Sequence, residues 1–223
     1  MHPYKIVVTQ ELFPRDLETR TTLCQDLLRN VPRTDVLLFT DEAHFHLSGT
    51  VNKQNFRYWS EHNPQELHQR PLYSPKVTVW CAIFSFGVWG PYFFEEDGTT
   101  VTVTSNRYCE MLEHFLRPKL NDFFHEYGQQ NVWFQQDGAT AHTARQTFGI
   151  REMFPGHIVS LRGDIGWSPR SPDLNPCDFF FWGYIKAQVY QHRPQTLEAL
   201  KEVIILEIAA IPPEMTLSHR KLP

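Results

Sequence analysis

The chain has 223 residues, of which 41% are hydrophobic, so it can bury a substantial core and we expect a single domain. Its formal net charge of -4 counts against a broad basic surface, and so against strong sequence-independent binding of nucleic acid by the whole molecule. The 4 cysteines are scattered and form no C-x-x-C pair, which argues for free thiols and against a structural zinc site. No apolar run of roughly eighteen residues and no signal-peptide pattern occurs, so we expect a soluble intracellular protein without a membrane partner.

The first half of the chain predicts one helix and then three strands. Apolar residues at helical spacing between two prolines predict an amphipathic helix from Pro14 to Asn30. The apolar residues 36–39 predict a buried strand that ends at Asp41. Two β-rich runs around a glycine, residues 77–84 and 88–94, then predict an antiparallel hairpin.

The second half predicts alternating helices and strands. Pro118 should kink or divide the first of these helices. The predicted elements are a helix over 105–126, a strand over 132–134, a helix over 141–154, a strand over 157–161, an irregular loop over 163–176, an aromatic helix over 178–190 and a helix over 196–210. This order predicts an α/β fold with a mixed five-stranded sheet and flanking helices, in which the hairpin extends a parallel part.

Three aspartates stand at the ends of predicted rigid elements. Asp41 and Asp137 each follow an apolar strand, and Asp178 lies where a proline-rich turn becomes the aromatic helix. Magnesium prefers oxygen ligands and keeps several waters, so a few carboxylates together with substrate phosphate oxygens can form its site. Two such ions roughly 3.5–4 Å apart can activate the attacking oxygen and stabilise the leaving oxygen of a phosphoryl displacement. We therefore expect the three acids to converge on one metal-binding pocket, although each taken alone is more often a turn residue or a helix cap.

The segments around these acids resemble the signature blocks of mariner-like transposases, in the Tc/mariner superfamily. The matching segments are Thr40-Asp41-Glu42, Val79-Trp80-Cys81-Ala82 leading to Gly90-Pro91-Tyr92-Phe93-Phe94, Gln136-Asp137-Gly138-Ala139 with His142, and Ser171-Pro172-Asp173-Leu174-Asn175-Pro176 followed by Asp178. The resemblance runs from about Tyr4 to Met215 and implies an RNase H-like DDE/D catalytic core. It also implies cleavage of DNA at transposon ends and joining of the freed 3′ hydroxyl to a target. The reaction would use two magnesium or manganese ions. The family's catalytic, metal-binding triad falls on Asp41, Asp137 and Asp178.

The resemblance also sets the expected domain organisation and partners. We expect residues 1–223 to form a single catalytic domain that lacks the N-terminal helix-turn-helix modules of the family and is truncated at its C-terminus. The expected function is that of a metal-dependent DNA endonuclease and strand transferase in the nucleus. Its expected partners are transposon-end and target DNA, with a second copy or a full-length transposase as protein partner. Two alternatives stay open, a catalytically silent relic that binds nucleic acid or protein, and a nuclease that acts on RNA hybrids.

Further residues allow two interpretations each. His44 and His46 form an H-x-H pair that either binds zinc or, more commonly, fills polar surface. His142 either reaches the acidic site or DNA, or packs at a helix start. The aromatic residues 179–184 either stack on bases or, as we favour, anchor the helix of the third acid in the core. Trp59 is a candidate for partner or DNA contact. Four arginines either contact phosphates or form a solvated face. These are Arg145, Arg151, Arg162 and Arg170.

Overall fold

The computed structural model describes residues 11–49, 74–128, 131–143 and 149–217. Within these ranges the strands are β1 (Val36–His46), β2 (Lys76–Phe84), β3 (Gly87–Phe93), β4 (Glu95–Glu96), β5 (Thr99–Thr100), β6 (Val132–Gln135), β7 (Ile158–Ser160) and β8 (Ile165–Gly166). The α-helices are α1 (Pro14–Asn30), α2 (Ser105–Met111), α3 (Arg117–Tyr127), α4 (Thr140–Thr143), α5 (Gly149–Met153), α6 (Trp182–Val189), α7 (Leu197–Ala209) and α8 (Pro213–Leu217). Two π-helical turns, η2 (Leu112–Leu116) and η5 (Cys177–Phe181), and two 3-10 turns, η4 (Pro172–Leu174) and η6 (Tyr190–His192), complete the set.

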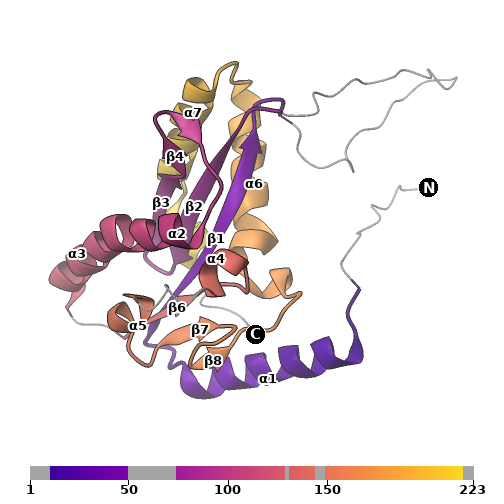
Figure 1. The fold of residues 1–223 in the computed structure, drawn as a ribbon. Coiled ribbons are helices and arrows are strands. Elements are labelled where there is room, and N and C mark those ends of the chain that lie inside the picture. Colours follow the sequence, from indigo (N-terminus) through magenta and orange to yellow (C-terminus); the bar gives the residue numbers. More distant parts are fainter. Residues whose placement is uncertain (1–10, 50–73, 129–130, 144–148, 218–223) are drawn as a thin grey trace, which may run out of the picture.

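The main sheet formed by the described residues has six strands in the order β3-β2-β1-β6-β7-β8 (Figure 1). β2 runs antiparallel to both β1 and β3, whereas β1, β6, β7 and β8 are parallel. The predicted hairpin therefore extends a parallel part, as expected. The sixth strand, β8, lies in the stretch predicted to be an irregular loop, where a side chain at Gly163 would meet the Ile158 carbonyl and only glycine fits the tight return.

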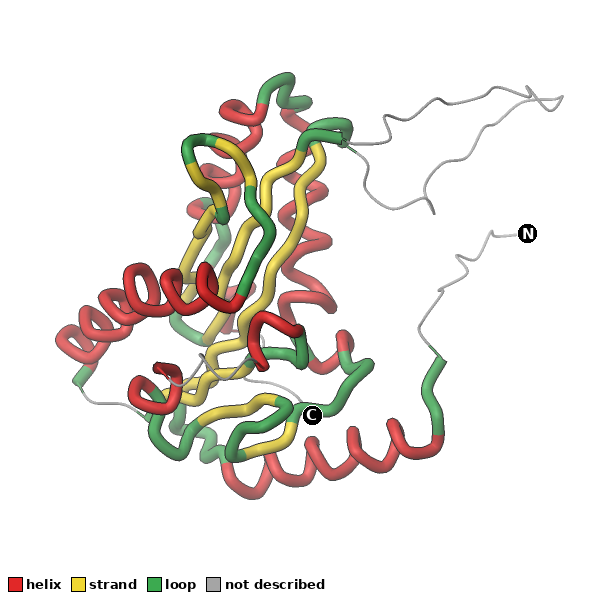
Figure 2. The backbone as a smooth tube through the Cα atoms, in the orientation of Figure 1, coloured by secondary structure: helices red, strands yellow, loops and turns green. Residues whose placement is uncertain are grey.

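Helices cover both faces of this sheet, which makes a three-layer α/β/α arrangement (Figure 2). Side chains of β2 alternate between the two faces, and both sets are buried. Trp80, Ala82 and Phe84 pack toward α2, η2 and α3, whereas Val79 and its alternate neighbours pack toward α6 and α7. A fully buried apolar side chain stabilises a fold by about 1.5–3 kcal/mol, so these two layers account for most of the hydrophobic stabilisation.

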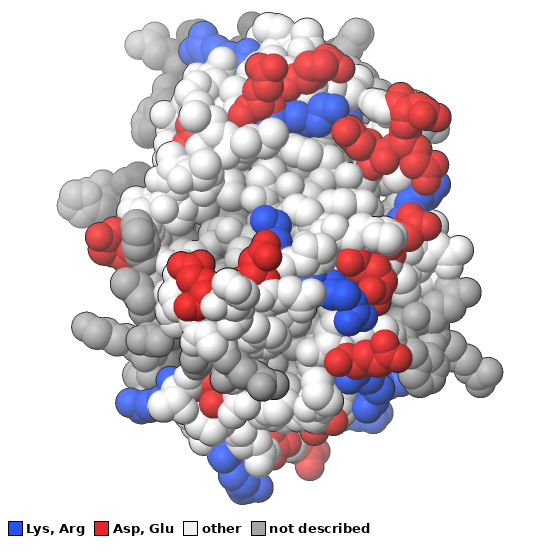
Figure 3. Space-filling model, turned by 90° about the vertical axis from the view of Figure 1, so that its left-hand side faces the viewer, with Lys and Arg blue, Asp and Glu red and all other residues white. Residues whose placement is uncertain are grey.

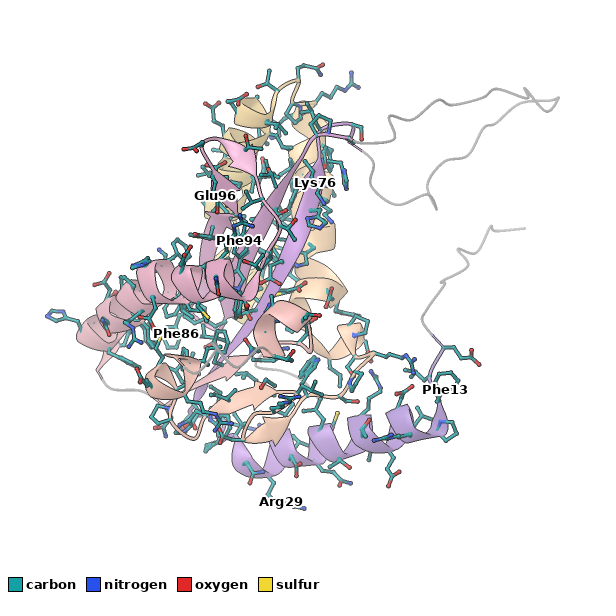
Figure 4. The ribbon with its side chains drawn as sticks, viewed as in Figure 1. Phe13, Arg29, Lys76, Phe86, Phe94 and Glu96 are labelled. Carbon is teal, nitrogen blue, oxygen red and sulfur yellow. The ribbon has the colours of Figure 1, made fainter. Side chains whose placement is uncertain are left out.

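Aromatic side chains fill much of the layer beneath α2 and α3. Phe94 is buried in this core, and Phe86 lies against Phe123 with ring centroids 5.5 Å apart (Figure 4). At the opposite end of the sheet, Leu23 of α1 packs with Trp133 and with buried residues of β7 and β8. The helix α1 therefore covers the end of the sheet formed by β7 and β8.

The predicted helix bounds agree with the structure at α1, and Pro118 divides the next helix as expected. A proline lacks the N–H and clashes with the carbonyl four residues earlier, and the wider π-turn η2 directly before α3 accommodates both effects. In α7 the hydroxyl of Thr196 accepts a hydrogen bond from the Ala199 N–H at 3.1 Å, which caps the helix near its predicted start.

Other predicted elements are refined or lie partly outside the described ranges. The helix expected over 141–154 corresponds to α4 and α5. Residues 144–148, between these two helices, lie outside the described residues. α8 was not predicted. No helix in the described ranges is long and apolar enough to span a membrane. On the face shown in Figure 3, Lys and Arg side chains alternate with Asp and Glu and do not form a broad basic patch.

Candidate functional site

The parallel pairing of β1 with β6 brings two of the predicted acids to one edge of the sheet. Phe39 and Gln135 form the last pair of this ladder. Asp41 and Asp137 each lie two residues after their strand's member of that pair. Thr40 joins the strands at this point, because its hydroxyl donates to the Gln135 carbonyl at 2.7 Å and its N–H donates to the Gln135 side-chain oxygen at 3.3 Å. The β1–β6 pairing stops here and presents both acids together. The prediction that the first strand ends at Asp41 is wrong, because β1 continues to His46 through its antiparallel pairing with β2.

The third acid reaches the same edge on the π-turn η5. The Asn175 side chain accepts a hydrogen bond from the Cys177 N–H at 3.0 Å and donates to the Thr40 carbonyl at 3.4 Å. The Cys177 thiol also approaches the Phe39 carbonyl at 3.4 Å. These contacts fix the start of the helix against β1, and Asp178 follows directly.

The ionisation of Asp41 and Asp178 shows that the three acids interact. Burial, together with the nearby Asp178 and Glu42 carboxylates, raises the pKa of Asp41 to about 8. Burial and the charge of Asp137 also raise the pKa of Asp178, while a hydrogen bond from Asp41 opposes the rise. Each of Asp41, Asp137 and Asp178 thus lies close enough to another of the three for its charge to matter, and their role as metal ligands stays a prediction.

The donor set fits a hard divalent cation in its chemistry. Three carboxylates offer the oxygen ligands that magnesium and manganese prefer, and acids crowded together out of water are stabilised by a cation. Within the part of the chain that the structure describes, however, no group of three or more His, Cys, Asp or Glu side chains is arranged to hold a metal ion. The acids converge, but their side chains do not form a closed ligand cage.

Two residues with alternative interpretations from the sequence, Trp182 and His142, contact the acids. The Trp182 indole N–H donates to Asp41 Oδ2 at 2.8 Å, so the aromatic helix both packs in the core and orients an acid. Phe181 and Trp182 are buried, which agrees with the favoured core-packing interpretation, whereas Phe179 is 75% exposed. Packing could be predicted from the aromatic pattern, but the contact of the indole with Asp41 depends on how α6 crosses β1.

His142 is the second such neighbour, and it lies buried beneath the acids. Its Nδ1 is 2.7 Å from Asp137 Oδ1 and its Nε2 is 3.2 Å from Glu42 Oε1. Burial alone would lower the pKa of His142, but the hydrogen bonds to Asp137 and Glu42 outweigh burial and raise it to about 10. Burial acts to raise the pKa of Asp137, yet the hydrogen bonds from His142 and from the Ala139 N–H prevail and lower it. His142 therefore belongs to the site, which decides between the two interpretations of this residue.

The remaining candidates lie elsewhere or are engaged in other contacts. His44 Nδ1 is 3.0 Å from the Thr78 hydroxyl, and within the described ranges no further ligand completes a zinc site with the H-x-H pair. Arg151 donates to the Arg162 carbonyl, and Arg170 forms an ion pair with Asp16. The other arginine candidate, at position 145, and the tryptophan candidate, at position 59, lie outside the described residues.

Comparisons with known proteins give one sequence relative and several solved structures. No family model matches the chain. It is 27% identical over 178 residues to the transposable element Tc3 transposase of Caenorhabditis elegans, which covers 79% of this chain and 49% of the relative. The chain therefore spans about half the length of this curated relative.

The solved structures share the fold at lower sequence identity. A pre-cleavage Mos1 transpososome matches with a TM-score of 0.75 and 21% identity, over 99% of this chain and 63% of the other. The catalytic domain of the Mos1 mariner transposase matches with a TM-score of 0.69 and 20% identity, over 96% of this chain and 91% of that domain. The same domain has been solved with raltegravir and Mg, with a TM-score of 0.68 and 19% identity, over 95% of this chain and 90% of that domain. The predicted RNase H-like α/β fold is confirmed.

Proposed function

Because the chain resembles mariner-like transposases in sequence and has the fold of their catalytic domain, we propose that it cleaves and transfers DNA strands with the help of a divalent metal. The observation that carries this proposal is the approach of three carboxylates to the point where the pairing of β1 with β6 stops. Rigid elements deliver all three, and in-line phosphoryl transfer tolerates little displacement of its groups.

We assign the metal ligands to Asp41, Asp137 and Asp178. These acids would hold two magnesium or manganese ions, which would supply activation of the attacking oxygen and stabilisation of the leaving oxygen. The solved Mos1 catalytic domain with Mg supports this choice of metal. In this chain, Trp182 and Thr40 would hold Asp41 in place, through the indole hydrogen bond and the link to β6.

We propose DNA as the substrate and the nucleus as the place of action. The Mos1 paired-end complex contains a left transposon end, which supports transposon-end DNA as the ligand of the related fold. A second copy of this chain or a full-length transposase is the proposed protein partner. In the first step water would attack the phosphorus of a backbone phosphodiester, break its bond to the 3′ oxygen and release a DNA 3′ hydroxyl. In the second step that hydroxyl would attack a phosphodiester of the target, join to its phosphorus and release the 3′ oxygen of the target strand.

A second candidate is a catalytically silent relic that binds DNA or protein. The observation that favours it is that, among the described residues, no three or more His, Cys, Asp or Glu side chains are arranged to hold a metal ion. The two candidates differ in whether addition of a cation produces strand cleavage.

A plasmid nicking assay separates them. Supercoiled plasmid is incubated with the protein and magnesium, manganese or a chelator, and the same series is run with Asp41→Asn, Asp137→Asn and Asp178→Asn. Asp122→Asn on the exposed face of α3 is the matched control. We expect metal-dependent nicking that each of the three site variants loses almost completely while its circular dichroism spectrum is unchanged.

Two results would contradict the assignment. Nicking by Asp137→Asn at the wild-type rate would remove that acid from the mechanism. DNA binding by the wild-type protein without nicking under any metal condition would favour the silent relic. A comparison of DNA with RNA–DNA hybrid substrates tests the remaining nuclease alternative.

A further inference from the structure

His142 connects two acids, Glu42 on β1 and Asp137 just beyond the end of β6. Its side chain is 2% exposed, and it lies within hydrogen-bond distance of Asp137 through Nδ1 and of Glu42 through Nε2. Each ring nitrogen therefore pairs with one carboxylate oxygen. The ring forms a bridge between β1 and the segment that follows β6.

The ring has little freedom to turn. It lies against the Tyr108 ring with centroids 4.3 Å apart. The Tyr108 hydroxyl donates to the Gln136 side-chain oxygen at 2.9 Å, and the Gln136 side-chain nitrogen donates to the His142 carbonyl at 3.2 Å. Packing and hydrogen bonds from α2 and β6 thus hold the imidazole in one orientation.

This orientation determines which carboxylate oxygen of Asp137 is engaged in hydrogen bonds. The Ala139 N–H donates to Oδ1 at 2.9 Å, and His142 Nδ1 lies 2.7 Å from the same oxygen. Among the described residues, no hydrogen bond engages Oδ2. The carboxylate is consequently fixed through one oxygen, and the other is left for a ligand.

The same ring restrains Glu42. Asp41 and Glu42 are neighbours on β1, so their side chains leave opposite faces of the sheet. Asp41 meets Trp182 on the α6 side, whereas Glu42 meets His142, which packs on Tyr108 of α2. The bridge holds the extra carboxylate on the α2 side.

We propose that His142 is a positioning residue of the cation site, which fixes Asp137 through Oδ1, leaves Oδ2 to bind a cation, and holds Glu42 on the face of β1 opposite Asp41. The inference rests on the proposed function, because it takes Asp137 as a metal ligand. Loss of a residue that orients a metal ligand typically costs about 10–100-fold in metal affinity or activity.

The test compares two substitutions at this position with a matched histidine. His142→Phe keeps a ring against Tyr108 and removes both donors, and His142→Gln keeps a single donating nitrogen. The control is His192→Gln, because His192 also pairs with a carboxylate, Glu207, but is 44% exposed and lies beyond the end of α6. Manganese affinity is measured from the free Mn²⁺ signal in electron paramagnetic resonance, and plasmid nicking is followed across a manganese titration.

We expect His142→Phe to weaken manganese binding by about 10–100-fold and His142→Gln to weaken it less. Nicking by both variants should recover in part at high manganese, and His192→Gln should match the wild type. The direction of the change decides the test: loss of a group that holds Asp137 in place weakens manganese binding, so an increase in affinity in either variant would overturn the positioning role.

The outcomes separate the inference from the proposed function. Wild-type manganese binding and nicking, with unchanged affinity in both His142 variants, would overturn the inference and leave the function standing. No manganese binding and no nicking by the wild type would overturn both. If His142→Phe is shown to be unfolded by circular dichroism, His142→Gln decides the result.

Discussion

The hydroxyl of Thr40 should be worth a measurable part of the stability of this fold, because it joins β1 to β6 directly before two of the acids. Thr40 is 2% exposed, and its hydroxyl donates to the Gln135 carbonyl at 2.7 Å. Thr40→Val keeps the branched shape and leaves that buried carbonyl without this donor, which costs about 1–3 kcal/mol. For a chain of this size each kcal/mol lowers the melting temperature by about 2–4 °C, so a loss of about 2 kcal/mol predicts a decrease of about 4–8 °C.

The assay is guanidinium and thermal unfolding of Thr40→Val beside Thr22→Val, in which the same substitution falls on the exposed face of α1. The control should unfold within about 0.5 kcal/mol of the wild type. If β1 and β6 separate by as little as about 1 Å, nicking should also fall by up to about 100-fold. Equal unfolding midpoints for Thr40→Val and the wild type would refute the argument that this hydroxyl holds the strand ends together.

Three further predictions concern the support of the site. Arg20→Met removes an ion pair with the half-exposed Asp173, which should cost up to about 1 kcal/mol at neutral pH. The hydrogen bond from Arg20 lowers the pKa of Asp173. The stability from this pair is therefore present above the ordinary aspartate pKa and is lost as the pH falls through the lowered value. If the guanidinium midpoints of variant and wild type do not converge in acid, the prediction is wrong. Ile204→Ala on the buried face of α7 should cost about 2–5 kcal/mol, whereas Ile205→Ala, at a position 49% exposed, should cost far less, and equal losses in chemical unfolding would contradict the packing of α7. Gly90→Ala would place a Cβ 2.5 Å from the sulfur of a buried cysteine on β2 at a φ of +148°, so its melting temperature should fall by several degrees, and a wild-type value would exclude this close approach.

Much of the architecture follows from local sequence patterns. The helical spacing between Pro14 and Asn30 and the apolar runs before Asp41 and Asp137 predict elements that the structure contains. These signals are strong because a buried strand or an amphipathic helix imposes its period on neighbouring residues. The two-residue strand β8 has no such period, since it is too short to show alternation, and it was missed for that reason.

The connections within the site could not be predicted in the same way. His142 contacts Glu42 across 100 positions of sequence, and this contact depends on the register of β1 against β6 and on the position of α2. The contact of Trp182 with Asp41 depends in turn on the π-turn that opens its helix. Composition indicates which residue types are available for chemistry, whereas three-dimensional register decides which of them meet.

Asp41 and Glu42 are neighbours on a strand that is covered on both faces, and this limits which deletions the protein tolerates. Deleting a single residue from β1 ahead of them would turn every later side chain of the strand to the opposite face. Glu42 would then occupy the α6 side and Asp41 the side of Tyr108, so a carboxylate would still stand on each face of β1 while its supporting partners were exchanged. Length changes in β1 should therefore abolish activity far more readily than conservative substitutions do, and an alignment gap at this strand would mark an inactive copy.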